Sequence, residues 1–279
     1  MENVLLHFVH ISDTHLLLPG QQLDYSDIPP VLETYAQQVL SLPYDSQAVA
    51  EALIREISAL PVQPDFVLHT GDVAAQLRSP DDYGYMIDVL NRIPYPVYYL
   101  PGNHDDPDAL RRFSRGDDAP PYYSFEVNGV QIACLDTASH PAVPHGGGLD
   151  DAQLAWLEAL CTAPDPRPLV VALHHHPVAI GVPWLDTLIL DNGDALHRIL
   201  LKAGSRLRGV FNGHIHYAID VMRDGILYSS AASAWCQFTG WPDHDRATLD
   251  MHVNPGFSLV TLTTEATFVR RHRYNPISE

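Results

Sequence analysis

Short apolar runs alternate with amphipathic stretches along the first part of the chain. Three runs rich in β-branched and aromatic residues predict strands, at 4–12, 65–71 and 96–102. Between them, apolar side chains recur at helical spacing over 46–59, which Asp45 or Ser46 would cap, and over 79–93, which opens at a Ser-Pro pair. This alternation predicts βα units and a sheet with parallel strands.

Hairpins interrupt the alternation in the rest of the chain. Residues 122–137 form two apolar runs around Asn128-Gly129, a pair that favours a tight two-residue turn. The further predicted elements are a helix at 150–161, a strand at 168–176, a helix at 192–204, strands at 208–214 and 217–231, and a last hairpin at about 257–274. Together, these elements predict a system of mixed β-sheets.

Composition supports one α/β domain with an acidic surface. The 279 residues, 46% of them hydrophobic, are enough for a sizeable core, and we expect a single domain over 1–279 with an irregular loop insertion at about 16–48. The formal net charge of −18 repels nucleic acid and anionic membranes, so neither is expected as a partner. Homo-oligomer formation stays open. An anionic substrate such as a phosphate ester would need local cations, which metal ions can supply.

The cysteines and the start of the chain indicate a cytoplasmic protein. Cys134, Cys161 and Cys236 are an odd number with no CxxC spacing, which predicts reduced thiols in the core. The opening segment MENVLLHFVHISD has no basic region at its start and is interpreted as a strand, not a signal peptide. No apolar run approaches the roughly 20 residues needed to span a bilayer.

Carboxylate, amide and imidazole side chains follow the predicted strands, each at the point where an apolar run ends. They are Asp13 and His15, then Asp72, then Asn103, His104 and Asp105, then Asp136, then His174, His175 and His176, and finally His214 and His216. Because the carboxyl ends of parallel strands share one edge of a sheet, these side chains can converge. One such motif alone fits a turn or a cap, but their repetition at successive strands predicts a site.

The chemistry of this set is that of a metal centre. Carboxylates, an amide and imidazoles suit manganese, iron or zinc better than calcium. About seven ligands are too many for one ion and suit two, which at about 3.5–4 Å apart clamp both oxygens of an in-line displacement. His7, His10 and His69 lie inside strand runs instead, where we expect hydrogen-bonded structural histidines.

The ordered series DTH, GD, GNHD, HHHP and GHIH resembles the calcineurin-like metallophosphoesterase superfamily, over residues 8–217 approximately. The longer series HISDTHL, GDVA, YLPGNHD, LDT, GLDDAQLAWL, HHHPV and GHIHY is similar to the bacterial class III 3′,5′-cyclic-nucleotide phosphodiesterases. Glycerophosphodiesterases and nucleoside-diphosphate-linked pyrophosphatases carry near-identical blocks. The resemblance implies a four-layer α/β/β/α sandwich of two mixed β-sheets flanked by helices.

The resemblance also implies a role for each motif residue, toward two divalent or mixed-valence ions of manganese, iron or zinc. The first ion would be held by Asp13, His15 and His216, the second by Asn103, His214 and one histidine of the triplet, and Asp72 would bridge the two. Strand alternation leaves His174 and His175 open. In the family the ligand stands two residues before the proline, which points to His175.

With these roles, the expected reaction is hydrolysis of phosphodiesters, foremost 3′,5′-cyclic nucleotides such as cAMP to 5′-monophosphates. Two cations neutralise phosphate oxygens and lower the pKa of a bridging water from about 15.7 towards about 7, so that hydroxide attacks at neutral pH. His104 would protonate the leaving group or bind a phosphate oxygen, and Asp105 or Asp136 would either orient a histidine or serve a purely structural role. The rival hypotheses are a phosphomonoesterase or protein phosphatase and, from another class, a non-catalytic metal-binding module.

One segment departs from the family pattern. Residues 16–48 are longer than we expect for these phosphodiesterases, and within them 32–42 predict a short extra helix over the mouth of the site. Aromatic residues in loops can stack a base there, although such residues more often serve packing; they are Trp184, Trp235, Trp241 and Phe238. The substrate pocket is therefore the part that the sequence defines least.

Overall fold

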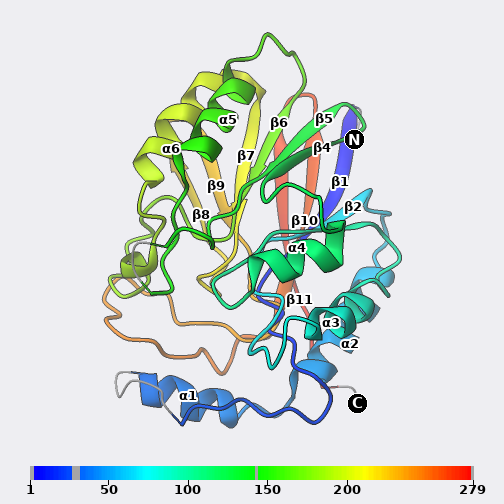
Figure 1. Ribbon diagram of the computed structural model, residues 1–279, viewed down its shortest axis with the longest axis vertical. Helices are drawn as coiled ribbons and strands as arrows, with labels where there is room; N and C mark the ends of the chain where they lie inside the picture. Colours follow the sequence, from blue (N-terminus) through cyan, green and yellow to red (C-terminus); the bar gives the residue numbers. More distant parts are fainter. Residues whose placement is uncertain (1–2, 27–31, 142–143, 278–279) are drawn as a thin grey trace.

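The computed structural model describes residues 3–26, 32–141 and 144–277, so part of the predicted insertion, 27–31, lies outside the described residues. Eleven strands in these ranges form two sheets (Figure 1). The strands are β1 (Val4–Ile11), β2 (Phe66–His69), β3 (Val97–Tyr99), β4 (Tyr123–Val127), β5 (Val130–Cys134), β6 (Leu169–Ala172), β7 (Leu207–Asn212), β8 (Asp220–Arg223), β9 (Ile226–Ser230), β10 (Gly256–Thr263) and β11 (Thr267–Arg273).

Both sheets are mixed. The first has the order β11-β10-β1-β2-β3, in which β1, β2 and β3 run parallel and β10 pairs antiparallel with β1. The second has the order β4-β5-β6-β7-β9-β8, with β5, β6, β7 and β9 parallel. The predicted hairpin turns are present, and Asn128 and Gly129 both have a positive φ, as a two-residue turn between twisted strands requires.

Helices cover the outer faces of the two sheets, except for α1 (Glu33–Leu40), which lies at one end of the molecule (Figure 1). The others are α2 (Ser46–Ser58), α3 (Asp82–Leu90), α4 (Pro107–Arg115), α5 (Asp151–Thr162) and α6 (Gly193–Leu200), with short 3₁₀ helices at Leu185–Leu188 and Leu201–Arg206. The carboxylate of Asp45 accepts a hydrogen bond from the backbone N–H of Ala48, so Asp45, not Ser46, is the N-cap of α2.

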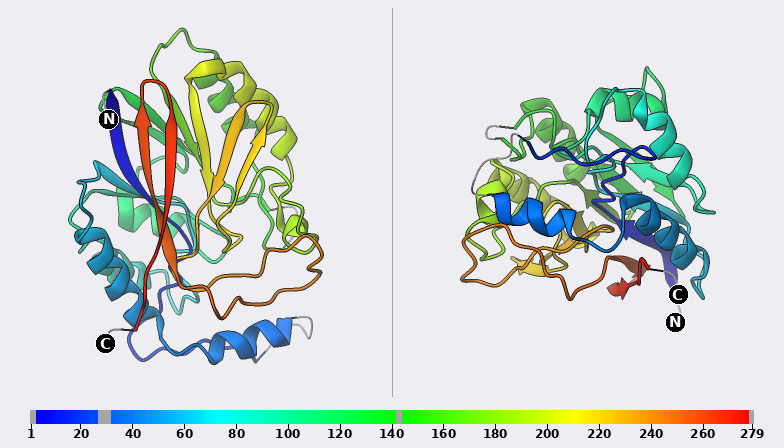
Figure 2. Two further views of the ribbon diagram at one scale, coloured as in Figure 1. Left: turned by 180° about the vertical axis from the view of Figure 1, so that it is seen from behind. Right: turned by 90° about the horizontal axis from the view of Figure 1, so that it is seen from below.

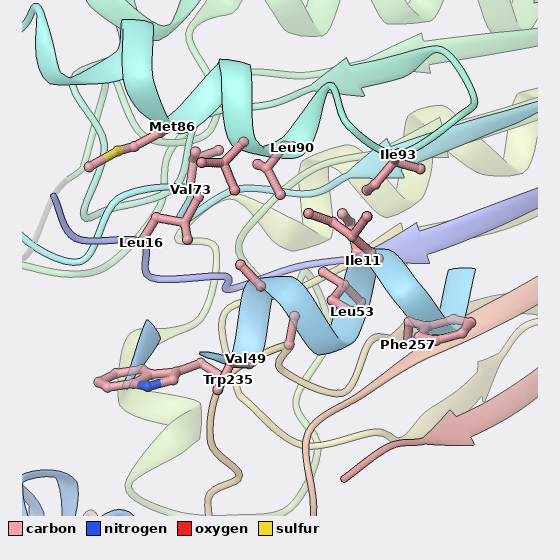
Figure 3. Packing of buried hydrophobic residues seen from close by; sticks show 14 of the residues in the cluster. Ile11, Leu16, Val49, Leu53, Val73, Met86, Leu90, Ile93, Trp235 and Phe257 are labelled. Carbon is pink, nitrogen blue, oxygen red and sulfur yellow. The ribbon is translucent and has the colours of Figure 1, made fainter. Parts of the chain in front are cut away.

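The hydrophobic core lies in three layers between these elements. Phe8, Phe66 and Phe211 pack between the two sheets, and neighbouring residues on the same strands point the other way toward helices. On the first sheet's outer face, Leu53 of α2 packs with Ile11 (Figure 3), while α5 and α6 cover the second sheet. The four-layer α/β/β/α sandwich that the resemblance implied is confirmed.

The parallel strands of both sheets point toward one end of the sandwich. At this end α1, as expected from 32–42, lies beside the irregular segment that follows β9 (Figure 1 and Figure 2). The two are joined by the backbone N–H of Leu249, which donates to Oε1 of Gln38. The predicted insertion therefore lies along the same edge of the sheets at which the predicted ligands are found.

Two further sequence-based expectations meet the structure here. Helix α4 was not expected, although Asp106 accepts a hydrogen bond from the N–H of Ala109 and Pro107 takes the first turn, both usual signs of a helix start. The three cysteines are free and buried, as predicted. Among the described residues, no helix is long and apolar enough to cross a membrane.

Candidate metal centre

Five of the seven predicted ligands stand on turns in which the backbone is left-handed. The φ angles are 57° at Asp13, 45° at His15, 54° at Asp72, 72° at His214 and 45° at His216. Residues other than glycine rarely adopt this conformation, and each instance costs on the order of 1–3 kcal/mol. Such turns redirect the chain sharply after β1, β2 and β7, and the surrounding contacts must hold them.

Backbone pairing between the turns after β1 and β2 supplies part of this support. The N–H of Asp13 donates to the carbonyl of Gly71 at 2.9 Å, and the N–H of His15 donates to the carbonyl of Asp72 at 3.1 Å. The parallel ladder thus continues past the ends of the strands. Asp13, His15 and Asp72 are therefore positioned as one unit, although they are far apart in the sequence.

Asp13, His15, Asp72 and His216 form a first, fully buried group whose donor atoms all lie within 4.8 Å of one another. The Nε2 atoms of His15 and His216 face each other at 3.0 Å, and Nε2 of His216 lies 3.4 Å from a carboxylate oxygen of Asp13. Two imidazole nitrogens and two carboxylates that converge in this way fit a cation between them.

A second group lies next to the first. It contains His174, His175 and His214, with donor atoms again within 4.8 Å. The Oδ1 atom of Asn103 lies 3.1 Å from Nε2 of His174, and Nε2 of His214 is buried with no hydrogen-bond partner among the described residues. A buried nitrogen left without a partner is unfavourable in the protein alone and fits a ligand to a metal.

Asp72 lies between the two groups. Its Oδ2 atom is 3.6 Å from Nε2 of His15 in the first group and 3.5 Å from Nε2 of His174 in the second. Its Oδ1 atom accepts a hydrogen bond from the backbone N–H of His104 at 2.9 Å, which fixes the carboxylate plane. One carboxylate oxygen that faces both donor groups is the arrangement expected of a bridging ligand.

Both His174 and His175 lie in the second group, and the assignment of His175, to which the family pattern points, stays a prediction. Nδ1 of His174 donates to the carbonyl of Thr70 at 2.7 Å, and its Nε2 contacts Asn103 and Asp72. His175 turns its Nδ1 to Oγ1 of Thr137 at 2.8 Å, and its Nε2, like that of His214, is buried with no hydrogen-bond partner among the described residues. Strand β6 ends at Ala172, so the alternation of an extended strand does not apply to the histidine triplet.

The surroundings of Asp72 and His214 hold these two residues in forms that bind metal. Burial opposes the ionisation of Asp72, but His174 and His104 outweigh it and keep the pKa of Asp72 well below its usual value. Burial, followed by the neighbouring His175, lowers the pKa of His214 far below its usual value, so its ring is neutral. An ionised carboxylate and a neutral imidazole are the states that ligate metal ions.

Two carboxylates raise the pKa of the histidines that they face, against the effect of burial. Burial alone would lower the pKa of His174, but Asp72 raises it to about 9. Burial is likewise outweighed at His216, where Asp13 raises the pKa well above its usual value. Both carboxylates thus attract positive charge to these positions, which a bound cation would also supply.

The glycines of the motifs allow the ligand loops to approach each other closely. A Cβ atom on Gly71 would lie against Nδ1 of His174, and a Cβ atom on Gly102 would meet Oδ1 of Asp72. Gly71 also has a φ of 102°, which favours glycine. These glycines thus belong to the packing of the site and do not merely end strands.

Asp105 positions loops. The expected role of orienting a histidine is not supported, because its hydrogen bonds go to other groups. It accepts hydrogen bonds from the N–H groups of Val73, Ala74 and Gly102 and from the hydroxyl of Tyr83. These bonds tie the loop that carries the predicted bridging ligand to the loop that carries the predicted amide ligand.

Asp136, the other candidate, accepts bonds from the backbone of Ala138 and Ser139 and shapes its own turn. The next residue, Thr137, is the one that contacts a histidine of the site, His175.

His104 and His145 lie beside the predicted ligands. The Nδ1 of His104 donates to the carbonyl of Ala75 at 3.1 Å, which leaves Nε2 available, and its ring lies 4.9 Å from that of His15. His145, for which the sequence suggested no partner, receives a hydrogen bond at Nδ1 from Nδ2 of Asn103 at 3.2 Å. The loop that carries His145 has no recognisable motif. The run of glycines after His145 was the only sequence feature that could have indicated its role.

The histidines inside strands are structural, as predicted. His7 contacts the hydroxyl of Thr261, and His10 contacts the hydroxyl of Thr70, each at 3.0 Å. Further along, His69 contacts the hydroxyl of Thr14 at 2.9 Å. Two of these contacts join the residues on either side of the ligand loops, so these histidines support the site without facing it.

An open cleft of about 1040 Å³ begins at the two donor groups and extends outward. Its inner part is lined by His15, Asp72, Asn103, His104, His214 and His216, and its outer part by residues of the insertion and of the segments near Trp184 and Phe238. The predicted base-stacking residues Trp184, Trp235 and Phe238 line the cleft, while Trp241 does not and is largely exposed. The cleft is large enough for a small-molecule substrate.

Comparison with known proteins places this geometry in a family context. Residues 6–218 match the family model of the calcineurin-like phosphoesterases. The chain is 34% identical to the 3′,5′-cyclic adenosine monophosphate phosphodiesterase CpdA of Escherichia coli (strain K12), over 76% of this chain and 77% of that protein. It is 29% identical to the glycerophosphodiester phosphodiesterase GpdQ of Enterobacter lignolyticus (strain SCF1), over 74% and 69% respectively.

A solved structure supports the fold at lower identity. The dimetal phosphatase from Danio rerio superposes with a TM-score of 0.65 at 15% identity, covering 99% of this chain and 98% of that one. This likeness concerns the arrangement of the sheets and helices, which agrees with the four layers described above.

The choice between His174 and His175 can be tested by metal content. His175→Ala should leave about one of two ions bound after loading with Mn²⁺ and gel filtration, because it removes a buried imidazole nitrogen that has no partner among the described residues. His174→Ala should retain both ions, and Asp72→Ala should lose both. Metal per chain is measured by mass spectrometry, with thermal unfolding as a check of folding. Loss of an ion in His174→Ala alone would reverse the assignment.

His145 should act by orienting the Asn103 amide. His145→Ala should weaken activation by Mn²⁺ or lower activity about 10–100-fold, the usual effect of removing such a supporting hydrogen bond. His145→Asn keeps an acceptor near the position of Nδ1 and should restore most of the loss. His140→Ala, on the same loop, is the control, since His140 pairs with Asp150 instead. An Asn variant as impaired as the Ala variant would contradict this role.

Proposed function

The chain belongs to the calcineurin-like phosphoesterase family and is a metal-dependent phosphodiesterase, and from this premise we propose that its preferred substrates are 3′,5′-cyclic nucleotides, hydrolysed to 5′-monophosphates. The observation that carries the proposal is Oδ2 of Asp72, which faces both donor groups. The choice of cyclic nucleotides is supported by relatives named as cyclic-nucleotide phosphodiesterases, which align with about three-quarters of the chain.

The donor atoms suit two divalent ions. We propose that the first is held by Asp13, His15 and His216, the second by Asn103, His175 and His214, and that Asp72 contacts both. Oxygen and imidazole donors without thiolates favour manganese, iron or zinc. When bound, such a pair of ions supplies positive charge to the phosphate and lowers the pKa of a water molecule.

His104 is proposed as the residue that acts on the leaving group. Its backbone N–H is fixed to Asp72 and its Nδ1 to a carbonyl, so the ring is held with Nε2 available at the inner end of the cleft. From there Nε2 can donate a proton or a hydrogen bond to the departing alkoxide oxygen. Two fixed contacts at one ring restrict its orientation, which proton transfer requires.

The charge of the cleft favours diesters over monoesters. A diester carries one negative charge and a monoester close to two, so a monoester needs an additional cation. The arginines near the motifs are engaged elsewhere: Arg111 and Arg206 bind backbone carbonyls, and Arg112 pairs with Asp81. Among the described residues that line the cleft, the arginine is Arg246, which lies beside Asp245.

His104→Ala should keep both metal ions and lose about 10²–10⁴-fold in kcat, the usual contribution of acid–base catalysis. The loss should be smaller for bis-p-nitrophenyl phosphate, because p-nitrophenolate leaves without a proton. His252→Ala, an exposed loop histidine, is the control. Loss of metal from His104→Ala would show that His104 is a ligand instead.

Substrate preference is tested with a panel assayed on Mn²⁺-loaded enzyme. We expect higher kcat/KM for bis-p-nitrophenyl phosphate than for p-nitrophenyl phosphate, and higher kcat/KM for 3′,5′-cAMP than for 2′,3′-cAMP or glycerophosphodiesters. A preference for the monoester would overturn the charge argument. Fast turnover of glycerophosphodiesters without cyclic-nucleotide activity would keep the reaction and replace the substrate. Two bound ions without turnover of any ester would favour the non-catalytic hypothesis.

A further inference from the structure

The cleft is larger than the reacting phosphate and a compact cyclic substrate require. At about 1040 Å³ it reaches the upper end of the range of roughly 300–1,000 Å³ typical of small-molecule sites. A cyclic nucleotide with its phosphate at the donor groups can place its base against Trp184 or Phe238, but the cleft also extends to Leu23, Tyr25 and Leu32 of the predicted insertion. The residues that line the outer part should therefore indicate what this part of the cleft binds.

Apolar and aromatic side chains line this outer part. They are Leu23, Tyr25, Leu32 and Tyr35 of the insertion, Leu77, Pro183, Trp184 and Leu188, and Phe238 with Ala247. Several of them remain half-exposed in the cleft. Half-exposed apolar side chains that gather in a concave surface mark a binding site for an apolar group.

The aromatic side chains form a continuous wall that starts at the metal centre. The ring of Phe238 stacks on that of His216, with centroids 4.7 Å apart. Trp184 packs edge-on against Phe238 at 4.9 Å, and Tyr35 lies 5.6 Å from Phe238 on another side. Tyr25 extends the wall beyond Tyr35 at 6.2 Å. A group attached to a phosphate at the centre would thus pass directly along these rings.

The charges of the outer wall disfavour a second anionic group. Among the described lining residues, those with charged side chains in this part are Asp24, Asp245 and Arg246. Arg246 lies 3.3 Å from Asp245, which leaves the carboxylate of Asp24 without a basic partner in the wall. A diphosphate-linked substituent would meet net negative charge here, whereas a neutral apolar one would not.

We propose that the outer cleft binds a large, neutral, apolar substituent of an acyclic phosphodiester, so that such diesters are substrates beside cyclic nucleotides. The inference rests on the proposed phosphodiesterase activity. The substituent packs on the wall formed by Trp184, Phe238 and Tyr35, while the phosphate lies at the donor groups. The binding energy of a group remote from the reacting bond then contributes to kcat/KM.

The test uses alkyl p-nitrophenyl phosphates with methyl, butyl, octyl and dodecyl groups, below their micelle concentrations. All release p-nitrophenolate, so the reacting bond stays the same. For the wild-type enzyme we expect kcat/KM to rise with chain length, by up to about fourfold for each buried methylene. The double variant Trp184→Ala, Tyr35→Ala should flatten this dependence, and Trp184→Phe should preserve it. Trp241→Ala, an exposed tryptophan outside the cleft, is the matched control.

The outcomes separate this inference from the proposed function. Turnover of all four esters with no dependence on chain length would overturn the inference and leave the phosphodiesterase activity standing. A dependence that persists unchanged in a folded double variant would also overturn it, because the apolar group would then bind elsewhere. No turnover of any ester by metal-loaded enzyme would overturn the proposed function and the inference with it.

Discussion

The geometry and charge balance of the candidate site depend on a single buried carboxylate between two groups of imidazoles. Asp72 is nearly inaccessible to solvent, and a charge in such a place is stable only when opposite charge or hydrogen-bond donors surround it. Its two oxygens have different partners. Oδ1 accepts a hydrogen bond from a backbone N–H, and Oδ2 faces His15 and His174. Positive charge from neighbouring histidines can balance this carboxylate, and in the proposed function bound cations supply it at the same positions.

Keeping the carboxylate in place requires support from many parts of the sandwich. Asp72 itself has a left-handed backbone, and Gly71 and Gly102 lie so close that a methyl group on either would displace a site residue. Asp105, held by Tyr83 of α3, joins the two loops. Stability contributed by the layers of the core thus compensates the local strain and the burial of charge at the end of the strands.

The features that the sequence predicted are those that follow from regular periodicity. The strands carry their ligands where each apolar run ends, and because parallel strands share an edge, the convergence of Asp13, Asp72 and His214 could be expected. Positions outside regular elements could not be assigned in this way. His174 and His175 follow the end of β6, where the alternation stops, and His145 reaches Asn103 from a loop without a motif. Helix α4 buries only Ala109 and Leu110 of its nine residues, so its apolar periodicity is weak, and its start at Asp106 and Pro107 was the feature that could have indicated it.

Reaction and specificity are built from different parts of the chain. The donor groups come from turns directly after core strands, whose positions are fixed by two packed sheets, and their arrangement varies little without loss of the core. The outer cleft comes from the insertion around α1 and from the segment after β9, which contact each other through Leu249 and Gln38. Such segments can change length and composition while the sheets remain intact. The chemistry at the phosphate is therefore constrained by the fold, whereas the alcohol or acyclic substituent that is accepted depends on loops that the fold leaves free to vary.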